Sequence, residues 1–154
     1  MTEVATVYLE PAEWADLVSP YLTEGRKTES WEIVSIEVTG KTLKAVVRMT
    51  SVYRSATDGG QFHLSIFTTL EFLTQLWIIY AHVWAGEKKK TREGWMVESA
   101  THNIKVIRDP EHIDVEMEAA SMRKVGGALY SVAKFRVTDR LGGLCTVKLK
   151  GLMP

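Results

Sequence analysis

The sequence is poor in cysteine and proline, and neither sign of charge is in excess. Its 154 residues include 1 cysteine and 4 prolines. The lone Cys145 excludes an internal disulfide and gives no metal-ligand spacing, a pattern typical of a reducing cytoplasm. The 19 basic residues balance 19 acidic ones, so no global field attracts nucleic acid or an anionic membrane. We therefore expect a cytoplasmic protein without a bound metal, a nucleic-acid partner or a membrane partner.

The chain also lacks an obvious leader and an uninterrupted apolar span. The N-terminal stretch "MTEVATVYLE" has no basic region followed by an apolar one, so no secretory signal is apparent. A membrane span needs about 20 apolar residues, and the longest apolar run, residues 70–85, is broken by Glu71, Thr74, Gln75 and His82. This run predicts a buried helix. The length of the chain fits one domain, so we expect a single domain over residues 1–154.

Hydrophobic patterning predicts strands on both sides of this helix. Residues 11–22 show helical spacing, whereas residues 30–53 contain two β-rich runs joined at Gly40, with a bulge expected at Ser35. Residues 113–119 alternate apolar and acidic side chains, as in a strand covered on one face. The segment "DRLGG" then separates two further runs as a hairpin.

This order of elements predicts an α+β fold in which an antiparallel sheet wraps around one long central helix. A curled sheet is the economical way to bury a single apolar helix on most of its circumference. That architecture is the hot-dog fold. A cystatin-like or steroid-isomerase-like cone is the main rival, but such folds usually place more than one substantial helix before the strands.

The N-terminal end of the long helix carries the residues best suited to catalysis. His63 and Ser65 follow a loop in which Gly59 and Gly60 allow unusual backbone conformations. A helix N-terminus offers N–H donors and a positive dipole end to a carbonyl oxygen that gains charge. A histidine beside it can activate water near neutral pH. A loop histidine and a plain N-cap serine are the structural alternatives.

Other polar residues extend this region along the helix. Thr68, Glu71, Gln75 and His82 share one stripe of a 3.6-residue helix, which is either solvated or faces another subunit. Glu71 can activate water, or it can close a capping box with Thr68. Tyr53 can point its hydroxyl into the same region or pack as an aromatic side chain.

Several further features favour structural roles. Trp77, Tyr80 and Trp84 are expected to pack in the core or at a dimer interface, and Cys145 is expected in the core. The basic run "EKKKTREGW" after the helix is expected to be a solvated connection. Docking of an acidic acyl carrier protein on this run is the alternative.

The segments "GQFHLSIFTTLEFLTQL" and "YSVAKFRVTDRLGGLCTVKLKG" resemble the hot-dog thioesterases, and among them the FcoT-like family of type III fatty acyl-CoA thioesterases. His63, the pair Gln75-Leu76 and the pair Gly142-Gly143 match elements of that family. Ser65 and Thr74 stand where the family carries asparagines, and Tyr53 matches a family tyrosine if a small insertion is allowed.

The resemblance implies hydrolysis of an acyl thioester of coenzyme A or an acyl carrier protein by a homodimer or higher homo-oligomer. It implies no cofactor beyond the coenzyme A or phosphopantetheine of the substrate. Taking the residue patterns and the resemblance together, we expect the catalytic residues to be His63, Ser65, Glu71 and Tyr53. We expect the substrate-binding residues to be Gly60, Phe62, Leu64, Thr68, Thr74 and Gln75.

Two other functions fit the same residues. A hot-dog lyase would dehydrate a 3-hydroxyacyl thioester or add an amine such as glycine to an enoyl thioester, although the Pro-rich "HFPGxPxMPG" loop of the fatty-acid dehydratases is missing. A non-catalytic protein would bind acyl thioesters without converting them.

Overall fold

A computed structural model describes Pro11, residues 28–54 and residues 56–154. Its elements, in chain order, are β1 (Ser30–Thr39), β2 (Thr42–Ser51), the 3-10 turn η1 (Ala56–Asp58), α3 (Ile66–Trp84), β3 (Trp95–Lys105), β4 (Ile113–Val125), β5 (Ala128–Asp139) and β6 (Leu144–Met153). The helix predicted over residues 11–22 lies outside the described residues, apart from Pro11.

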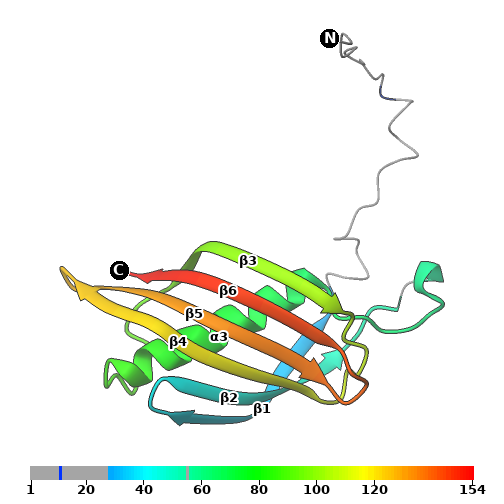
Figure 1. The fold of residues 1–154 in the computed structure, drawn as a ribbon, viewed down its shortest axis with the longest axis horizontal. Coiled ribbons are helices and arrows are strands. Elements are labelled where there is room, and N and C mark those ends of the chain that lie inside the picture. The colour runs from blue at the N-terminus through cyan, green and yellow to red at the C-terminus, as the bar shows by residue number, and fades with distance from the viewer. Residues whose placement is uncertain (1–10, 12–27, 55) are drawn as a thin grey trace.

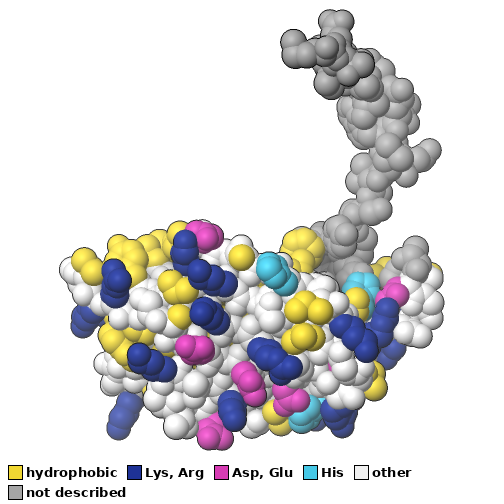
Figure 2. Space-filling model, in the orientation of Figure 1, with side chains coloured by type: hydrophobic (Ala, Val, Ile, Leu, Met, Phe, Trp, Pro, Cys, Tyr) yellow, Lys and Arg dark blue, Asp and Glu magenta, His cyan; other side chains and the backbone are white. Residues whose placement is uncertain are grey.

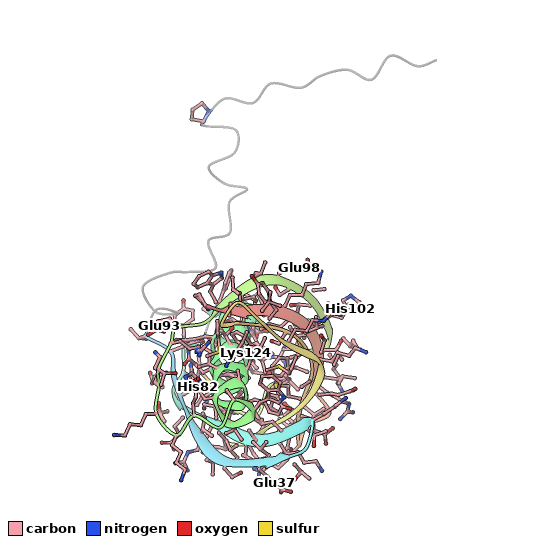
Figure 3. The ribbon with its side chains drawn as sticks, turned by 90° about the vertical axis from the view of Figure 1, so that its left-hand side faces the viewer. Glu37, His82, Glu93, Glu98, His102 and Lys124 are labelled. Atoms are coloured by element: carbon pink, nitrogen blue, oxygen red, sulfur yellow. The ribbon has the colours of Figure 1, made fainter. Side chains whose placement is uncertain are left out.

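The six strands form one sheet in the order β1-β2-β4-β5-β6-β3, and every neighbouring pair is antiparallel. The sheet curls around α3, as the view along the helix in Figure 3 and the view across the sheet in Figure 1 show together. This arrangement confirms the hot-dog fold predicted from the sequence. Within the described residues, β1 and β3 are the edge strands of this sheet.

The predicted hairpins are present. Gly40, at φ 57°, turns β1 into β2. The register shifts between Ile33 and Ser35, so the bulge predicted at Ser35 is confirmed and the extra residue is Val34. A left-handed conformation is needed in the second hairpin as well, where Gly142 lies at φ 83° between β5 and β6.

The core is filled by the sheet-facing side of α3. Trp77 is fully buried, and its indole Nε1 donates a hydrogen bond to Ser131 Oγ. Glycine is required opposite this ring, because a Cβ added at Gly94 would lie 2.8 Å from Trp77 Cζ3 and one added at Gly151 would lie closer still. Tyr80 is also buried, and its hydroxyl donates to the carbonyl of Gly40 over 3.0 Å. Core packing is therefore confirmed for both residues.

Cys145 and Trp84 differ in their burial. Cys145 lies in the core as predicted, and burial raises the pKa of its thiol. Trp84, at the end of α3, is 45% exposed and does not belong to this core.

The length and apolar composition of α3 would suffice to cross a membrane, but 56% of the relevant window is buried inside the structure. The helix is the core of the fold.

Charged side chains are spread over the outward face of the sheet, as Figure 2 shows. On that face Lys150 of β6 pairs with Glu98 of β3 at 2.7 Å.

The polar stripe predicted along α3 is solvated only in its middle. Glu71 and Gln75 are exposed, whereas Thr68 and His82 are buried. Thr68 is covered because its hydroxyl donates to Glu29 Oε2 over 2.8 Å. His82 Nδ1 donates to the Ile78 carbonyl at 2.8 Å, and its Nε2 accepts the backbone N–H of Thr91 at 3.4 Å. Contacts from outside the helix thus cover both ends of the stripe.

Candidate functional site

Ser65 caps the N-terminus of α3. Its backbone is extended, and its Oγ accepts the N–H of Thr68 over 3.2 Å. The same hydroxyl donates to Thr68 Oγ1 over 3.1 Å, and the Ser65 carbonyl accepts the first regular helical bond from the N–H of Thr69. The N-cap alternative is therefore confirmed for Ser65. The cap fixes the direction in which the positive end of the helix points.

A cavity of about 380 Å³ lies at this helix head. It is lined by His63, Leu64, Ser65, Ile66, Phe67, Thr101 and Asn103. The first five residues belong to the helix head and the preceding loop, and the last two belong to the edge strand β3. The cavity therefore combines a helix N-terminus, a histidine and an asparagine amide, which are groups able to bind a carbonyl and a water molecule.

Contacts on both sides hold the loop that carries His63. The N–H of Leu64 donates to the carbonyl of Ile107 over 2.9 Å, and Phe62 and Leu64 are both buried in the core. Phe62 thus acts as an anchor, and its carbonyl accepts a hydrogen bond from Arg108 Nη1 at 3.4 Å. Because its neighbours on either side are buried, the backbone at His63 is held in place by the loop that leads into the helix.

The His63 ring contacts an acid that the sequence did not single out. Its Nδ1 donates to Asp58 Oδ2 over 2.7 Å. Arg108 faces the same carboxylate, with Nη1 at 3.1 Å from Oδ2 and Nη2 at 3.3 Å from Oδ1. The hydrogen bond from Arg108, followed by that from His63, holds the pKa of Asp58 below its ordinary value of 3.8. An ionised Asp58 therefore faces His63 at neutral pH.

The connection between β3 and β4 is tied to the β5–β6 turn through Asp139. Its Oδ2 accepts the N–H groups of Arg108 at 2.7 Å and Asp109 at 3.0 Å, and its Oδ1 accepts those of Leu141 at 3.0 Å and Gly143 at 2.6 Å. Burial raises the pKa of Asp139, but these four N–H donors outweigh burial and bring the pKa below 3.8. The predicted "DRLGG" turn thereby supports the backbone that carries Arg108.

Asp139 gives a pH-dependent stability that can be measured. An Asp139→Asn variant is expected to lose about 1–3 kcal/mol of unfolding free energy at pH 7, because an amide satisfies these donors less completely. Since the folded pKa is lowered, the wild-type advantage is present above the ordinary value of 3.8 and is lost as the pH falls through the folded pKa. Urea unfolding at pH 7 and below pH 3.8 measures both values. An advantage that grows on acidification would contradict this assignment.

The remaining predicted site residues lie outside the cavity lining. Glu71 is exposed, and its Oε2 accepts a hydrogen bond from Trp31 Nε1 at 3.1 Å. The alternative in which Glu71 closes a capping box with Thr68 is wrong, because the cap is Ser65, one turn earlier. Thr74 Oγ1 donates to the Leu70 carbonyl at 2.7 Å within the helix. Thr74 thus satisfies its hydroxyl along α3.

Three other predicted residues are also placed by the fold. Gln75 is exposed on α3, and Tyr53 is half-buried two residues beyond the end of β2. Gly60, at φ 69°, provides the turn that leads from η1 into the His63 loop. The structure therefore brings His63, Leu64 and Ser65 together in one cavity and places the other predicted residues outside its lining.

Sequence patterns missed four polar residues of this site, Asp58, Arg108, Thr101 and Asn103. Arg108 contacts Asp58 across 50 residues of chain, and Asn103 reaches the cavity only because β3 lies along the edge beside the helix head. Asp58 was the detectable one, since an acid five residues before a candidate histidine can reach its ring across a glycine turn.

No protein-family model and no curated protein sequence matches the chain. Solved structures do match it. A hot-dog-like protein from Thermanaerovibrio acidaminovorans is 18% identical with a TM-score of 0.53, over 75% of this chain and 82% of that one. These values support the fold described above.

Two further structures are similar to this chain and contain coenzyme A or its acetyl thioester. A hypothetical thioesterase protein from Streptococcus pneumoniae, solved with coenzyme A, is 12% identical with a TM-score of 0.53, over 81% of this chain and 86% of that one. A Streptococcus mutans protein solved bound to acetyl-CoA is also 12% identical, with a TM-score of 0.56, over 88% of this chain and 97% of that one. At such identities the similarity shows the fold.

Proposed function

We propose that this protein is a cytoplasmic hot-dog enzyme that hydrolyses acyl thioesters of coenzyme A or an acyl carrier protein. The observation that carries the proposal is the cavity in which His63 lies beside the N-terminus of α3. A thioester carbonyl needs a donor for its developing oxyanion, and a water molecule needs a base; the cavity brings both groups together. Structures of similar fold with coenzyme A or acetyl-CoA support the class of substrate.

The proposed reaction follows from these groups. The thioester oxygen faces the first turn of α3, where the amide of Ile66 and the helix dipole stabilise negative charge. His63 takes a proton from water as the water oxygen bonds to the carbonyl carbon. The C–S bond then breaks, and the proton passes to the departing thiolate. The products are a carboxylic acid and a free thiol.

Asn103 supplies an amide that the family resemblance led us to expect elsewhere. The FcoT-like family carries an asparagine at the position of Ser65. In this protein the Ser65 hydroxyl instead caps the helix, by accepting the N–H of Thr68. Asn103 lines the same cavity from β3. We propose that its side chain positions the substrate or the attacking water, and that Ser65 acts by fixing the helix head.

A homodimer is part of this proposal because one wall of the cavity is an open sheet edge. β3 is an edge strand, and its exposed apolar side chains include Val97 at 62% and Ile104 at 64%. Such an edge is a template for pairing with a second strand. A second copy paired there would cover this side of the cavity. In this dimer the exposed Glu71 and Gln75 face the partner subunit.

A Val97→Lys substitution tests this interface. A charged side chain on an edge strand opposes strand pairing, so the variant is expected to sediment at half the wild-type mass. Val125→Lys is the matched control, because Val125 is equally exposed, at 61%, but lies at the far end of β4. A wild-type protein that sediments as a monomer would contradict the proposed dimer.

A lyase is the second candidate, because Ser65 and Thr74 stand at positions where the FcoT-like family carries asparagines. One experiment separates the functions. The protein is incubated with saturated, 3-hydroxy and enoyl thioesters, with and without glycine, and the intact mass of each product is measured. A hydrolase releases thiol from the saturated substrate. A lyase instead changes the acyl mass by water or glycine without releasing thiol, and a protein that leaves all masses unchanged is not an enzyme of either class.

A further inference from the structure

We propose that Asp58 is a positioning residue for His63, and that Arg108 fixes Asp58 in the orientation this role requires. The inference deepens the proposed function and rests on His63 being the base of that reaction. Nothing in the sequence resemblance assigns a role to either residue.

The contact between His63 and Asp58 fixes which ring nitrogen carries the proton. Nδ1 lies 2.7 Å from Asp58 Oδ2, and a carboxylate can only accept, so Nδ1 is the donor. The neutral ring then has its basic lone pair on Nε2. His63 and Asp58 are five residues apart, and the positive-φ residues Gly59 and Gly60 form the turn between them. The local chain thus brings the two side chains next to each other.

Arg108 holds the carboxylate from the other side of the loop. Its guanidinium contacts both oxygens of Asp58, at 3.1 Å and 3.3 Å, and so restricts rotation of the carboxylate plane. Two side chains from the described residues therefore bond to Asp58, namely His63 from its own segment and Arg108 from the β3–β4 connection. Arg108 also keeps Asp58 ionised, which preserves its ability to accept from Nδ1.

The Arg108 backbone is itself fixed by the β5–β6 turn. Asp139 accepts the N–H of Arg108, and the turn approaches so closely that a Cβ at Gly143 would lie 2.7 Å from Ile107 Cα. Ile107 in turn accepts the N–H of Leu64, next to His63. The Gly-Gly turn shared with the FcoT-like family thus supports the histidine both through Arg108 and Asp58 and through Ile107.

This arrangement has a defined part in the proposed reaction. When Nε2 accepts the proton of water, the ring becomes positively charged while Nδ1–H still faces Asp58. The carboxylate stabilises that charge and prevents the ring from turning. After the C–S bond breaks, Nε2 returns the proton to the thiolate and the ring is neutral again. Asp58 remains ionised throughout and contacts neither the water nor the thioester.

Asp58→Asn and Asp58→Ala test this role through two independent measurements. We expect kcat for thiol release to fall by about 100-fold, with KM within about twofold, because the residue orients the base and leaves substrate binding unchanged. The ¹⁵N shifts of the His63 ring in the free protein should move from the Nδ1–H form toward the Nε2–H form. Asp114→Asn is the matched control, since Asp114 pairs with His112 Nε2 at 3.1 Å outside the cavity.

The outcomes separate this inference from the proposed function. A wild-type protein that hydrolyses no thioester would refute the proposed function. In that case the ¹⁵N shifts of the His63 ring would still test whether Asp58 sets the tautomer of His63. Unchanged His63 shifts in Asp58→Ala would overturn the positioning role, as would an unchanged kcat in an active enzyme. Arg108→Gln adds a third readout. It should raise the pKa of Asp58 toward 3.8, measured from the carboxyl ¹³C shift, and a pKa that stays in place would refute the role of Arg108.

Discussion

Replacing His63 with alanine is expected to reduce thiol release from an acyl thioester by at least about 100-fold, because a positioned general base contributes about 100- to 10,000-fold to a rate. Residual hydrolysis should persist, since the helix N-terminus still stabilises the oxyanion. The measurement is kcat/KM for the wild type and for His63→Ala with the same substrate, from the thiol released, which a thiol-reactive dye detects.

His112→Ala is the control for this experiment. His112 is also half-exposed and also pairs with an aspartate, Asp114, but it lies outside the cavity lining. The control should keep the wild-type rate. Wild-type turnover in a folded His63→Ala protein would show that another group is the base, and Glu71 would be the next residue to replace.

Replacing Trp77 with alanine is expected to lower the free energy of unfolding by about 3–5 kcal/mol, the typical cost of removing a large aromatic side chain from a core. The ring is fully buried against Gly94 and Gly151, and neither glycine has a side chain that could fill the space it leaves. The loss of its bond to Ser131 adds to the effect. Urea unfolding followed by circular dichroism measures the change.

Trp84→Ala provides the matched comparison, since Trp84 is on the same helix but is 45% exposed. It should cost less than half as much as Trp77→Ala. Equal costs for the two substitutions would mean that the packing of α3 against Gly94 and Gly151 does not dominate the stability of the fold.

The fold was predictable because its dominant signals are local. Alternation along residues 113–119, the turn at Gly40 and the apolar length of α3 each report on a short stretch of chain, and each is confirmed. A single long helix among long strands, which is what the described residues contain, leaves few ways to bury that helix. The bulge near Ser35 was also visible, because a change of alternation marks the residue that the partner strand cannot match.

The helix cap shows where local patterns are ambiguous. Ser65 and Thr68 are both good N-cap residues, three positions apart, and Glu71 completes a capping box only with Thr68. The structure selects Ser65, because Leu64 is buried and its N–H is held by Ile107, which brings the chain into the helix at that point. That choice leaves Glu71 exposed and bonded to Trp31.

The candidate site was predictable only where its residues are neighbours in sequence. His63 and Ser65 were identified because they flank the start of an apolar helix. Arg108 and Asn103 were not, because the pairing of β3 in the sheet brings both residues to the site. Sequence periodicity carries no information on which strand ends beside which loop. The charged pair that orients His63 therefore became visible only in three dimensions.

The most direct test of the central claim is to map where an acyl thioester binds. Amide ¹H–¹⁵N spectra of the wild-type protein would be recorded during titration with an acyl-CoA thioether that cannot be hydrolysed. We expect the largest shifts at residues 63–67 and at Thr101 and Asn103, which line the cavity at the head of α3. Shifts confined to the other end of the helix, around the cavity lined by Lys88, Lys89 and Lys90, would contradict the account.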